Sequence, residues 1–189
     1  SQLEPHMLFN TLANLRVLSG VDAARAQAML DHLNAYLRAT LSASRAVQHP
    51  LADEFARLAD YLALMAVRMG PRLQVRLDLP AELARLPVPP LLLQPLVENS
   101  IKHGLEPQVD GGRIDITARR VGQQLVLAVR DTGAGPGAAA TGTDTSGGFG
   151  LVQVRERLAT VYGGRASLTL QAAGDAEGGT LATLRLPLS

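Results

Sequence analysis

The run Leu96-Val97-Glu98-Asn99-Ser100-Ile101-Lys102-His103-Gly104 is the most informative stretch of this chain. On a helix that turns about 100° per residue, Glu98, Asn99, Lys102 and His103 share one face, and Leu93, Val97 and Ile101 lie on the opposite face. We therefore expect one side of this helix to pack and the other to hold a ligand. Lys102 is the only lysine among 18 basic residues, and its compact ammonium group suits a phosphate.

Composition narrows the class of protein. The 189 residues are 47% hydrophobic and 19% charged, which is typical of a globular protein and argues against disorder. No apolar run approaches the roughly 20 residues of a membrane-spanning helix, and no signal peptide is recognisable. A net charge of +1 and 3% aromatic residues argue against nucleic-acid binding. The absence of cysteine excludes disulfides and thiolate metal sites and fits a cytosolic domain.

The first seventy residues are predicted to be helical, because their apolar residues recur at helical spacing. We expect a helical hairpin joined at residues 19–22, with Gly20 ending the first helix and Asp22 capping the second. A third helix should follow His49-Pro50 and end at Gly70. Its predicted buried residues are Leu51, Phe55, Leu58, Leu62 and Met65. Because the chain opens with Ser1 and not with methionine, we expect a piece of a longer protein that lacks much of the first helix.

From Leu73 the apolar period changes to two, which indicates strands. We expect strands at residues 73–79, 113–119, 125–129, 166–170 and 181–186, and helices at residues 90–103 and 151–162. Hairpins are expected at Gly122-Gln123 and within residues 174–179. The predicted fold class is α+β: a helical region at residues 1–70, followed by a two-layer α/β sandwich with a mixed sheet at residues 71–189.

Two glycine-rich elements and a loop follow in this second region. Asp131-Thr132-Gly133-Ala134-Gly135 stands at a strand end, where a carboxylate can accept hydrogen bonds and glycines let a ligand approach the backbone. Residues 136–147 predict a long loop of the kind that forms lids. Gly147-Gly148-Phe149-Gly150-Leu151 opens a helix, whose free N–H groups attract anions. Each element alone is also compatible with a plain turn or an ordinary helix start.

The order of these elements resembles the ATP-binding (GHKL, or Bergerat) fold shared by gyrase, the heat-shock chaperone, MutL and histidine kinases. It is not a P-loop, because no Gly-Lys-Ser/Thr follows the glycines. The resemblance implies that Asn99 coordinates a Mg²⁺ ion that bridges the ATP phosphates, and that Lys102 and His103 contact phosphate oxygens. It implies that Asp131 accepts a hydrogen bond from the adenine amino group. It assigns further nucleotide contacts to Gly133, Gly135, Gly148, Gly150 and Leu151.

The role of Glu98 stays open between several interpretations. In ATPases of this superfamily the corresponding acid activates water, whereas in kinases it assists phosphoryl transfer to another nucleophile or orients the metal ligands. An alternative without catalysis is an ion pair with Lys102 at the i,i+4 spacing.

The segment Glu4-Pro5-His6-Met7-Leu8-Phe9-Asn10 resembles the Pro-His-Phe-Leu-Phe-Asn box of sensor histidine kinases of the LytS class. The same class is indicated by residues 92–99 with Lys102-His103-Gly104, by Gly150-Leu151 and by Tyr162-Gly163-Gly164. In this class the histidine is autophosphorylated, which implies that His6 is the nucleophile. A neutral imidazole on an exposed helix suits that role, and Asn10 lies one turn later on the same face. Three positions depart from the class pattern: Glu4, Met7 and Gln153.

The resemblance implies a cytoplasmic kinase core that binds ATP and Mg²⁺, phosphorylates His6 and passes the phosphoryl group to an aspartate of a response regulator. Two chains are expected to pair through their N-terminal helices, and the full-length protein is expected to be anchored in the inner membrane. Two alternatives remain open. In the first alternative, the chain is a scaffold that binds nucleotide without catalysis. In the second, which fits the upstream helices less well, it is a clamp that hydrolyses ATP.

Overall fold

The structure, a computed structural model, describes residues 5–136 and 145–188, without the side chains of residues 145–149. The chain divides into two compact units. The first comprises Ser1–Pro71 and Leu86–Leu91, and the second comprises Arg72–Arg85 and Leu92–Ser189. Each unit has its own buried hydrophobic residues. In the part of the chain that the structure describes, no helix has both the length and the apolar character that crossing a membrane requires.

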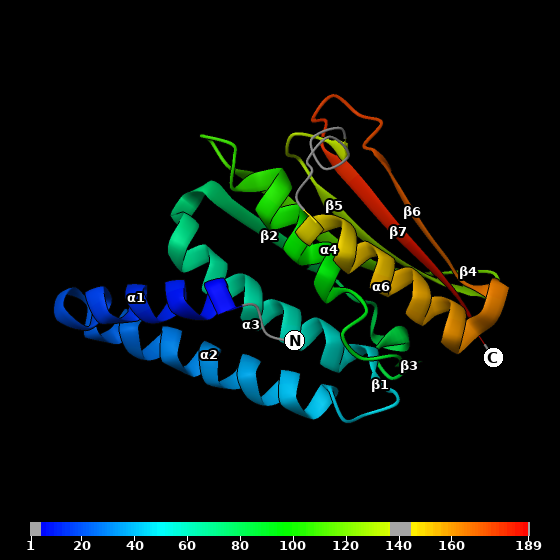
Figure 1. Cartoon of the computed structure of the whole chain (residues 1–189), viewed down its shortest axis with the longest axis horizontal. Coiled ribbons are helices and arrows are strands. Elements are labelled where there is room, and N and C mark those ends of the chain that lie inside the picture. Colours follow the sequence, from blue (N-terminus) through cyan, green and yellow to red (C-terminus); the bar gives the residue numbers. More distant parts are fainter. Residues whose placement is uncertain (1–4, 137–144, 189) are drawn as a thin grey trace. The chain divides into compact units, whose positions relative to one another are not determined.

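The first unit contains three helices, α1 (Pro5–Val21), α2 (Ala23–Ala43) and α3 (Leu51–Met69). Helix α2 packs against both α1 and α3 (Figure 1). The Asp22 side chain accepts a hydrogen bond of 3.1 Å from the Arg25 N–H, so the predicted cap of the second helix is confirmed. The prediction that Gly20 ends the first helix is wrong. Gly20 lacks the positive φ of a left-handed cap, and α1 continues to Val21.

The core of the first unit lies mainly between α2 and α3. All five residues predicted for the buried side of α3 are at most 5% exposed, so that prediction is confirmed. The rings of Tyr36 on α2 and Tyr61 on α3 lie 5.7 Å apart between centroids. Several leucines of the helical pattern stay outside this core, since Leu12 on α1 is 51% exposed and Leu41 on α2 is 57% exposed. An apolar surface is therefore left on the hairpin.

A two-stranded sheet joins a distant segment to the first unit, and the sequence did not indicate it. Strand β1 (His49–Pro50) pairs antiparallel with β3 (Pro87–Val88). Beside this pair the buried Glu54 carboxylate accepts the Leu91 N–H at 3.1 Å. The same carboxylate lies 2.8 Å from His49 Nε2 and 2.8 Å from Arg57 Nη2. Buried charges of this kind need partners, because desolvation without compensation costs several kcal/mol.

The second unit is built on a five-stranded mixed sheet with the strand order β2-β4-β5-β7-β6. Strand β2 runs parallel to β4, and the other pairs are antiparallel. All five strands and both hairpins correspond to the predicted ones. The strands are β2 (Leu73–Asp78), β4 (Gly112–Val121), β5 (Gln124–Asp131), β6 (Ser167–Ala172) and β7 (Thr180–Pro187). Short 3₁₀ turns are η1 (Gly70–Arg72), η2 (Ala81–Leu83) and η4 (Gly163–Arg165).

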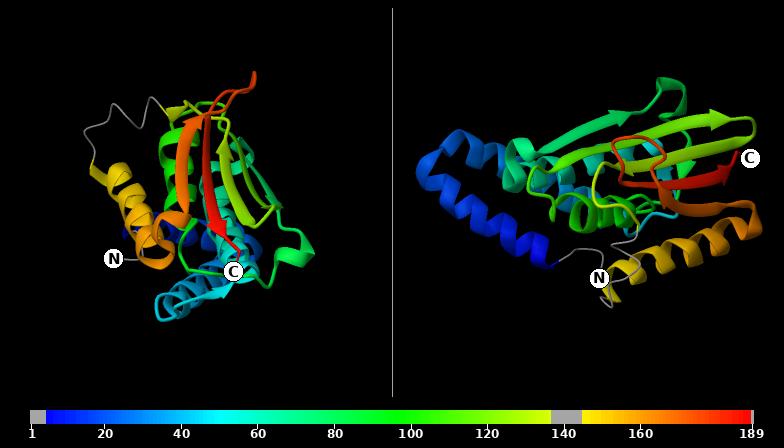
Figure 2. Two further views of the ribbon diagram at one scale, coloured as in Figure 1. Left: turned by 90° about the vertical axis from the view of Figure 1, so that its right-hand side faces the viewer. Right: turned by 90° about the horizontal axis from the view of Figure 1, so that it is seen from above.

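Helices cover one face of this sheet and complete the predicted two-layer sandwich (Figure 2). They are α4 (Gln94–Asn99), the π-helix η3 (Ser100–Leu105) and α6 (Thr145–Tyr162). The predicted helix at residues 90–103 is wrong in two respects: it begins four residues later, and from Ser100 it is π-helical. The Glu106 N–H bonds to Ile101 O at 2.9 Å, five residues back. Over a single turn, hydrophobic spacing cannot distinguish the two helix types.

Candidate functional site

Asp131 is the acidic residue that the sheet places inside the second unit. Along β5 every second side chain is buried, and Asp131 follows Leu125, Leu127 and Val129 in this alternation. The strand period therefore directs its carboxylate to the helix-covered face, where the residue is only 2% exposed. Its Oδ1 accepts the Gly133 N–H at 2.9 Å. A buried carboxylate at a strand end, beside glycines, can accept a hydrogen bond from a donor on a ligand.

The π-helix η3 lies directly against this carboxylate. A Cβ atom added to Gly104 would lie 2.8 Å from Asp131 Oδ1, so only glycine fits there without a shift. A Cβ atom on Gly133 would in turn collide with the Gly104 carbonyl oxygen. The Leu96–Gly104 run and the Asp131-Thr132-Gly133 element are separate in the chain, and they are in contact in the structure. The structure thus brings these two predicted elements together.

The electrostatics of Asp131 are set mainly by burial. Removal from water raises the pKa of its carboxyl group above the ordinary value of 3.8. The Gly133 backbone opposes this rise in pKa, followed by the Ser100 side chain, the Thr180 backbone and the charge of Arg130. The sequence did not single out Ser100 or Thr180. Ser100 lay within the predicted helix but on neither of its two predicted faces, and Thr180 lay between the predicted hairpin and the strand predicted at residues 181–186.

On the polar face of the Leu96–Gly104 run, some side chains form hydrogen bonds within the protein and one buried oxygen forms none with the described residues. Glu98 Oε1 accepts a hydrogen bond of 2.9 Å from Gln94 Nε2, one turn earlier on α4. The Oδ1 atom of Asn99 is buried, yet it accepts no hydrogen bond from the residues that the structure describes. Lys102 is exposed and His103 is half-buried. An unpaired buried carbonyl oxygen calls for an explanation, and a ligand outside the chain provides one.

The donor set fits a magnesium ion. Mg²⁺ prefers hard oxygen ligands and takes few of them from protein when phosphates supply the others. The amide oxygen of Asn99 is such a ligand. Among residues 5–136 and the described part of 145–188, no group of three or more His, Asp or Glu side chains could hold a metal by protein contacts alone.

The glycine elements are placed less completely. Gly135 has a φ of 84°, which few residues except glycine adopt. The predicted loop at residues 136–147 falls mostly on 137–144, outside the described residues. The following helix begins at Thr145, six residues before the predicted start. Gly148 therefore belongs to its first turn, whereas Gly150 and Leu151 follow that turn, beyond the first four free N–H groups of a helix.

His6 and Asn10 both lie on α1 in the first unit, and both side chains are exposed. An exposed imidazole can be reached by a reaction partner. Met7, one of the departures from the class pattern, is buried at 3% exposure, so its apolar bulk belongs to the core. Gln153 is exposed on α6, and Glu4 lies outside the described residues.

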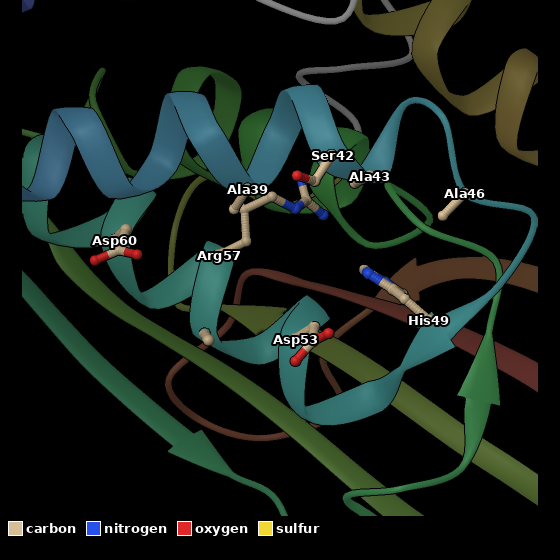
Figure 3. Close-up of a pocket in the computed structure, with 9 residues that line it drawn as sticks. Ala39, Ser42, Ala43, Ala46, His49, Asp53, Arg57 and Asp60 are labelled. Atoms are coloured by element: carbon tan, nitrogen blue, oxygen red, sulfur yellow. The ribbon is translucent and has the colours of Figure 1, made fainter.

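A cavity of about 360 Å³ opens in the first unit between α2 and α3 (Figure 3). His49, Asp53, Arg57 and Asp60 bring charged or ionisable groups to its walls, and small residues, mostly alanines, complete them. None of the predicted site residues lines it. Apart from His6, the first unit contains two histidines, and both lie beside a carboxylate: His49 beside Glu54 at 2.8 Å, and His32 beside Asp60 at 3.0 Å.

The chain matches the profiles of two known protein families. The profile described as "Histidine kinase-, DNA gyrase B-, and HSP90-like ATPase" matches residues 90–189, and the profile described as "Histidine kinase" matches residues 1–73. The chain belongs to the family of histidine kinase-, DNA gyrase B- and HSP90-like ATPases. It is 36% identical over 190 residues to the sensor histidine kinase BtsS of Escherichia coli strain K12, covering 99% of this chain and 32% of BtsS.

Other relatives agree with this assignment. The sensor protein LytS of Staphylococcus haemolyticus is 28% identical over 195 residues, which cover 99% of this chain and 33% of LytS. The chain thus spans about a third of the length of these curated relatives. Among solved structures, the histidine kinase domain of the Erythrobacter litoralis EL346 blue-light activated histidine kinase superposes with a TM-score of 0.56 at 17% identity. That match covers 99% of this chain and 90% of the other, and it shows the α+β fold of histidine kinases.

Proposed function

We propose that this chain is the catalytic core of a protein histidine kinase, which binds ATP with Mg²⁺ in its second unit and phosphorylates its own His6. One observation carries the proposal: the buried Oδ1 of Asn99 has no partner among the described residues. It stands on α4, directly before the π-helix whose Gly104 packs on the Asp131 carboxylate. A buried oxygen proposed to bind the metal and a buried hydrogen-bond acceptor, connected through one helical segment, suit the two ends of a nucleoside triphosphate.

The proposed binding roles follow from the chemistry of each group. The carboxylate of Asp131 accepts a hydrogen bond from the adenine amino group, beside Gly133 and Gly135. Near the end of the same helical segment, Lys102 offers a positive charge and His103 offers a ring N–H donor to phosphate oxygens. A further backbone contact is proposed for Gly148 in the first turn of α6, and Gly150 and Leu151 are proposed to lie beside the phosphates without donating their backbone N–H groups. Asn99 holds the Mg²⁺ ion, which supplies neutralisation of phosphate charge when bound.

The proposed transfer forms one bond and breaks one. The lone pair of an imidazole nitrogen of His6 attacks the γ-phosphorus, the bond from that phosphorus to the β-phosphate oxygen breaks, and ADP leaves. The ring then loses its remaining N–H proton, for which Glu98 is the proposed acceptor. Asn10, one turn after His6, hydrogen-bonds the ring or the incoming phosphoryl group. Positioning and charge neutralisation provide most of the catalysis in such transfers.

The proposal extends to partners and location. The phosphoryl group passes from His6 to an aspartate of a response regulator, which completes a two-component system. Two copies pair through α1 and α2, since the exposed apolar residues of this hairpin need a cover. The full-length protein is proposed to be an inner-membrane sensor with this domain in the cytoplasm.

The test is phosphorylation by ATP labelled on the γ-phosphate. Wild-type protein with Mg²⁺ should acquire label that is stable to base and labile to acid, as phosphohistidine is. His6→Ala should abolish the label, whereas His32→Ala, which alters an exposed histidine of the same unit, should retain it. Equal labelling of wild type and His6→Ala overturns the assignment of His6.

The two alternatives are separated by variants of the second unit. A kinase labels itself, a clamp releases inorganic phosphate without labelling, and a scaffold binds nucleotide without either reaction. Asn99→Ala should weaken the Mg²⁺-dependent part of ATP binding, measured by calorimetry with and without the metal. Glu98→Ala should retain nucleotide binding and slow the transfer. Phosphate release with no label on the protein favours the clamp.

A further inference from the structure

The turn between β6 and β7 carries two acids that bind arginines of two other strands. Glu177 pairs with Arg113 of β4 through two hydrogen bonds, of 3.0 Å from Nη1 and 2.7 Å from Nη2. Arg130 of β5 contacts Glu177 at 3.2 Å and Asp175 at 2.5 Å. We call these four residues, Arg113, Arg130, Asp175 and Glu177, the hairpin latch. It ties the β6–β7 hairpin across the neighbouring strands, so that the hairpin does not depend on its own turn alone.

The hairpin latch lies on the face of the sheet opposite to the Asp131 carboxylate. Arg130 directly precedes Asp131 on β5, and consecutive strand residues point to opposite faces of the sheet. Arg130 is cross-strand partner to Asp115, which also accepts the Arg113 Nε–H at 2.9 Å. The ion pairs therefore occupy the face opposite to the helices, while the Asp131 carboxylate faces η3.

Two residues that follow Glu177 in the hairpin, Gly179 and Thr180, lie next to the Asp131 backbone. Thr180, three residues after Glu177, is the register partner of Asp131 in the β5–β7 pair. Gly179 lies so close to the Asp131 carbonyl oxygen that no Cβ atom would fit. The Thr180 backbone is also one of the polar groups that favour the ionised Asp131 carboxyl group. A shift of the hairpin would therefore move the backbone that surrounds this carboxylate.

The charges of the hairpin latch persist at physiological pH. Hydrogen bonds from Arg113 and then Arg130 lower the pKa of Glu177 to about 2. An isolated ion pair at the surface contributes little, and Glu177 is half exposed. Here, however, one carboxylate is shared by two arginines, and the contact with Arg113 is bidentate, a geometry that fixes orientation as well as distance.

We propose that the hairpin latch positions Asp131 for adenine recognition, with Arg113, Arg130 and Glu177 as positioning residues that never touch the nucleotide. The proposal rests on the proposed function, in which Asp131 receives the adenine amino group. It predicts that loss of the hairpin latch weakens the adenine part of binding and leaves the triphosphate part intact. A residue that only stabilised the fold would weaken both parts together.

The test measures dissociation constants of the whole chain for adenosine, which carries no phosphate, and for inorganic triphosphate with Mg²⁺, which carries no adenine. In Glu177→Gln the affinity for adenosine should fall by about fivefold or more, and that for triphosphate should not change. Glu177→Asp, which keeps the charge, should recover part of the loss. The control is Glu82→Gln, an exposed acid of the same unit, which should leave both constants unchanged.

A second variant guards against an effect peculiar to one side chain. Arg130→Gln should reproduce the selective loss, and its combination with Glu177→Gln should lose less than the sum of both, because the two residues act through one contact. Unchanged adenosine affinity in Glu177→Gln, with adenosine bound by wild type, overturns the hairpin latch alone. If wild type binds neither adenosine nor ATP, the proposed function falls, and the hairpin latch falls with it.

Discussion

Gly104 and Asp131 are so close that a single added methyl group would lie 2.8 Å from the buried carboxylate oxygen. This contact joins the end of the Leu96–Gly104 run to the end of β5. It means that the segment with Asn99 and Lys102 cannot move independently of the acidic residue proposed to recognise adenine. The proposed phosphate and adenine contacts are thus coupled through one glycine.

The first prediction concerns this glycine. Gly104→Ala should lower ATP affinity by about tenfold or more, because the added methyl group forces η3 or Asp131 to shift, and overpacking of this kind costs about 1–3 kcal/mol. Fluorescent ATP analogues would measure the effect. Gly164→Ala is the matched control, since a Cβ atom there meets open space. Wild-type affinity in Gly104→Ala would show that the site tolerates the shift.

The second prediction concerns the titration of Asp131. Its folded-state pKa is raised above 3.8 by burial, so the folded protein takes up a proton at higher pH than the unfolded chain does. The resulting stability is fully present below the unfolded pKa and is lost as the pH rises through the folded pKa. Relative to Asp131→Asn, wild type should therefore gain free energy of unfolding on acidification through that window. Denaturant titrations of both proteins at several pH values would measure this.

The same residue should make ATP binding sensitive to pH. Protonation neutralises the carboxylate that is proposed to accept a hydrogen bond from the adenine amino group and so makes it a weaker acceptor. Wild-type affinity should therefore decline at a pH above the ordinary carboxyl value of 3.8. Asp131→Asn should bind ATP weakly at every pH and lack this decline. A decline of the same size in both proteins would exclude Asp131 as its source.

The third prediction concerns the buried charge in the first unit. Glu54 contacts His49, Arg57 and the Leu91 N–H, and its side chain is 1% exposed. Glu54→Ala should reduce the free energy of unfolding by about 3–5 kcal/mol, since it leaves a buried charge without its partner. Helical circular dichroism during denaturation would report it. Asp53→Asn, the exposed neighbour, should change stability by less than about 0.5 kcal/mol.

The fourth prediction concerns pairing of two chains. Phe9 is 71% exposed and Leu12 is 51% exposed on α1, so a partner hairpin would gain by covering them. Phe9→Ser with Leu12→Ser should weaken the dimer by about tenfold or more in sedimentation equilibrium. Val161→Ser, an exposed apolar residue of α6, should leave it unchanged. A monomeric wild type at all concentrations would contradict the pairing.

The sequence alone determined the elements whose signal is local. Alternating apolar residues located every strand of the five-stranded sheet, and the same alternation carries Asp131 to its buried face. Helical spacing identified the buried side of α3. The amphipathic run from Leu96 identified α4 but not the change to a π-helix at Ser100. A single turn with hydrogen bonds five residues apart, in place of four, leaves the spacing of the apolar residues almost unaltered.

Only the tertiary structure decided the contacts between distant segments. Arg113 and Glu177 are 64 residues apart, and nothing in the spacing of either indicates the other. The β1–β3 pair and the Glu54–Leu91 bond likewise join segments far apart in the chain. That Asn99 Oδ1 lacks a hydrogen-bond partner among the described residues could also be seen only in the folded structure. Local patterns define which face of an element is apolar, whereas partners are chosen by packing of the whole chain, and the site depends on both.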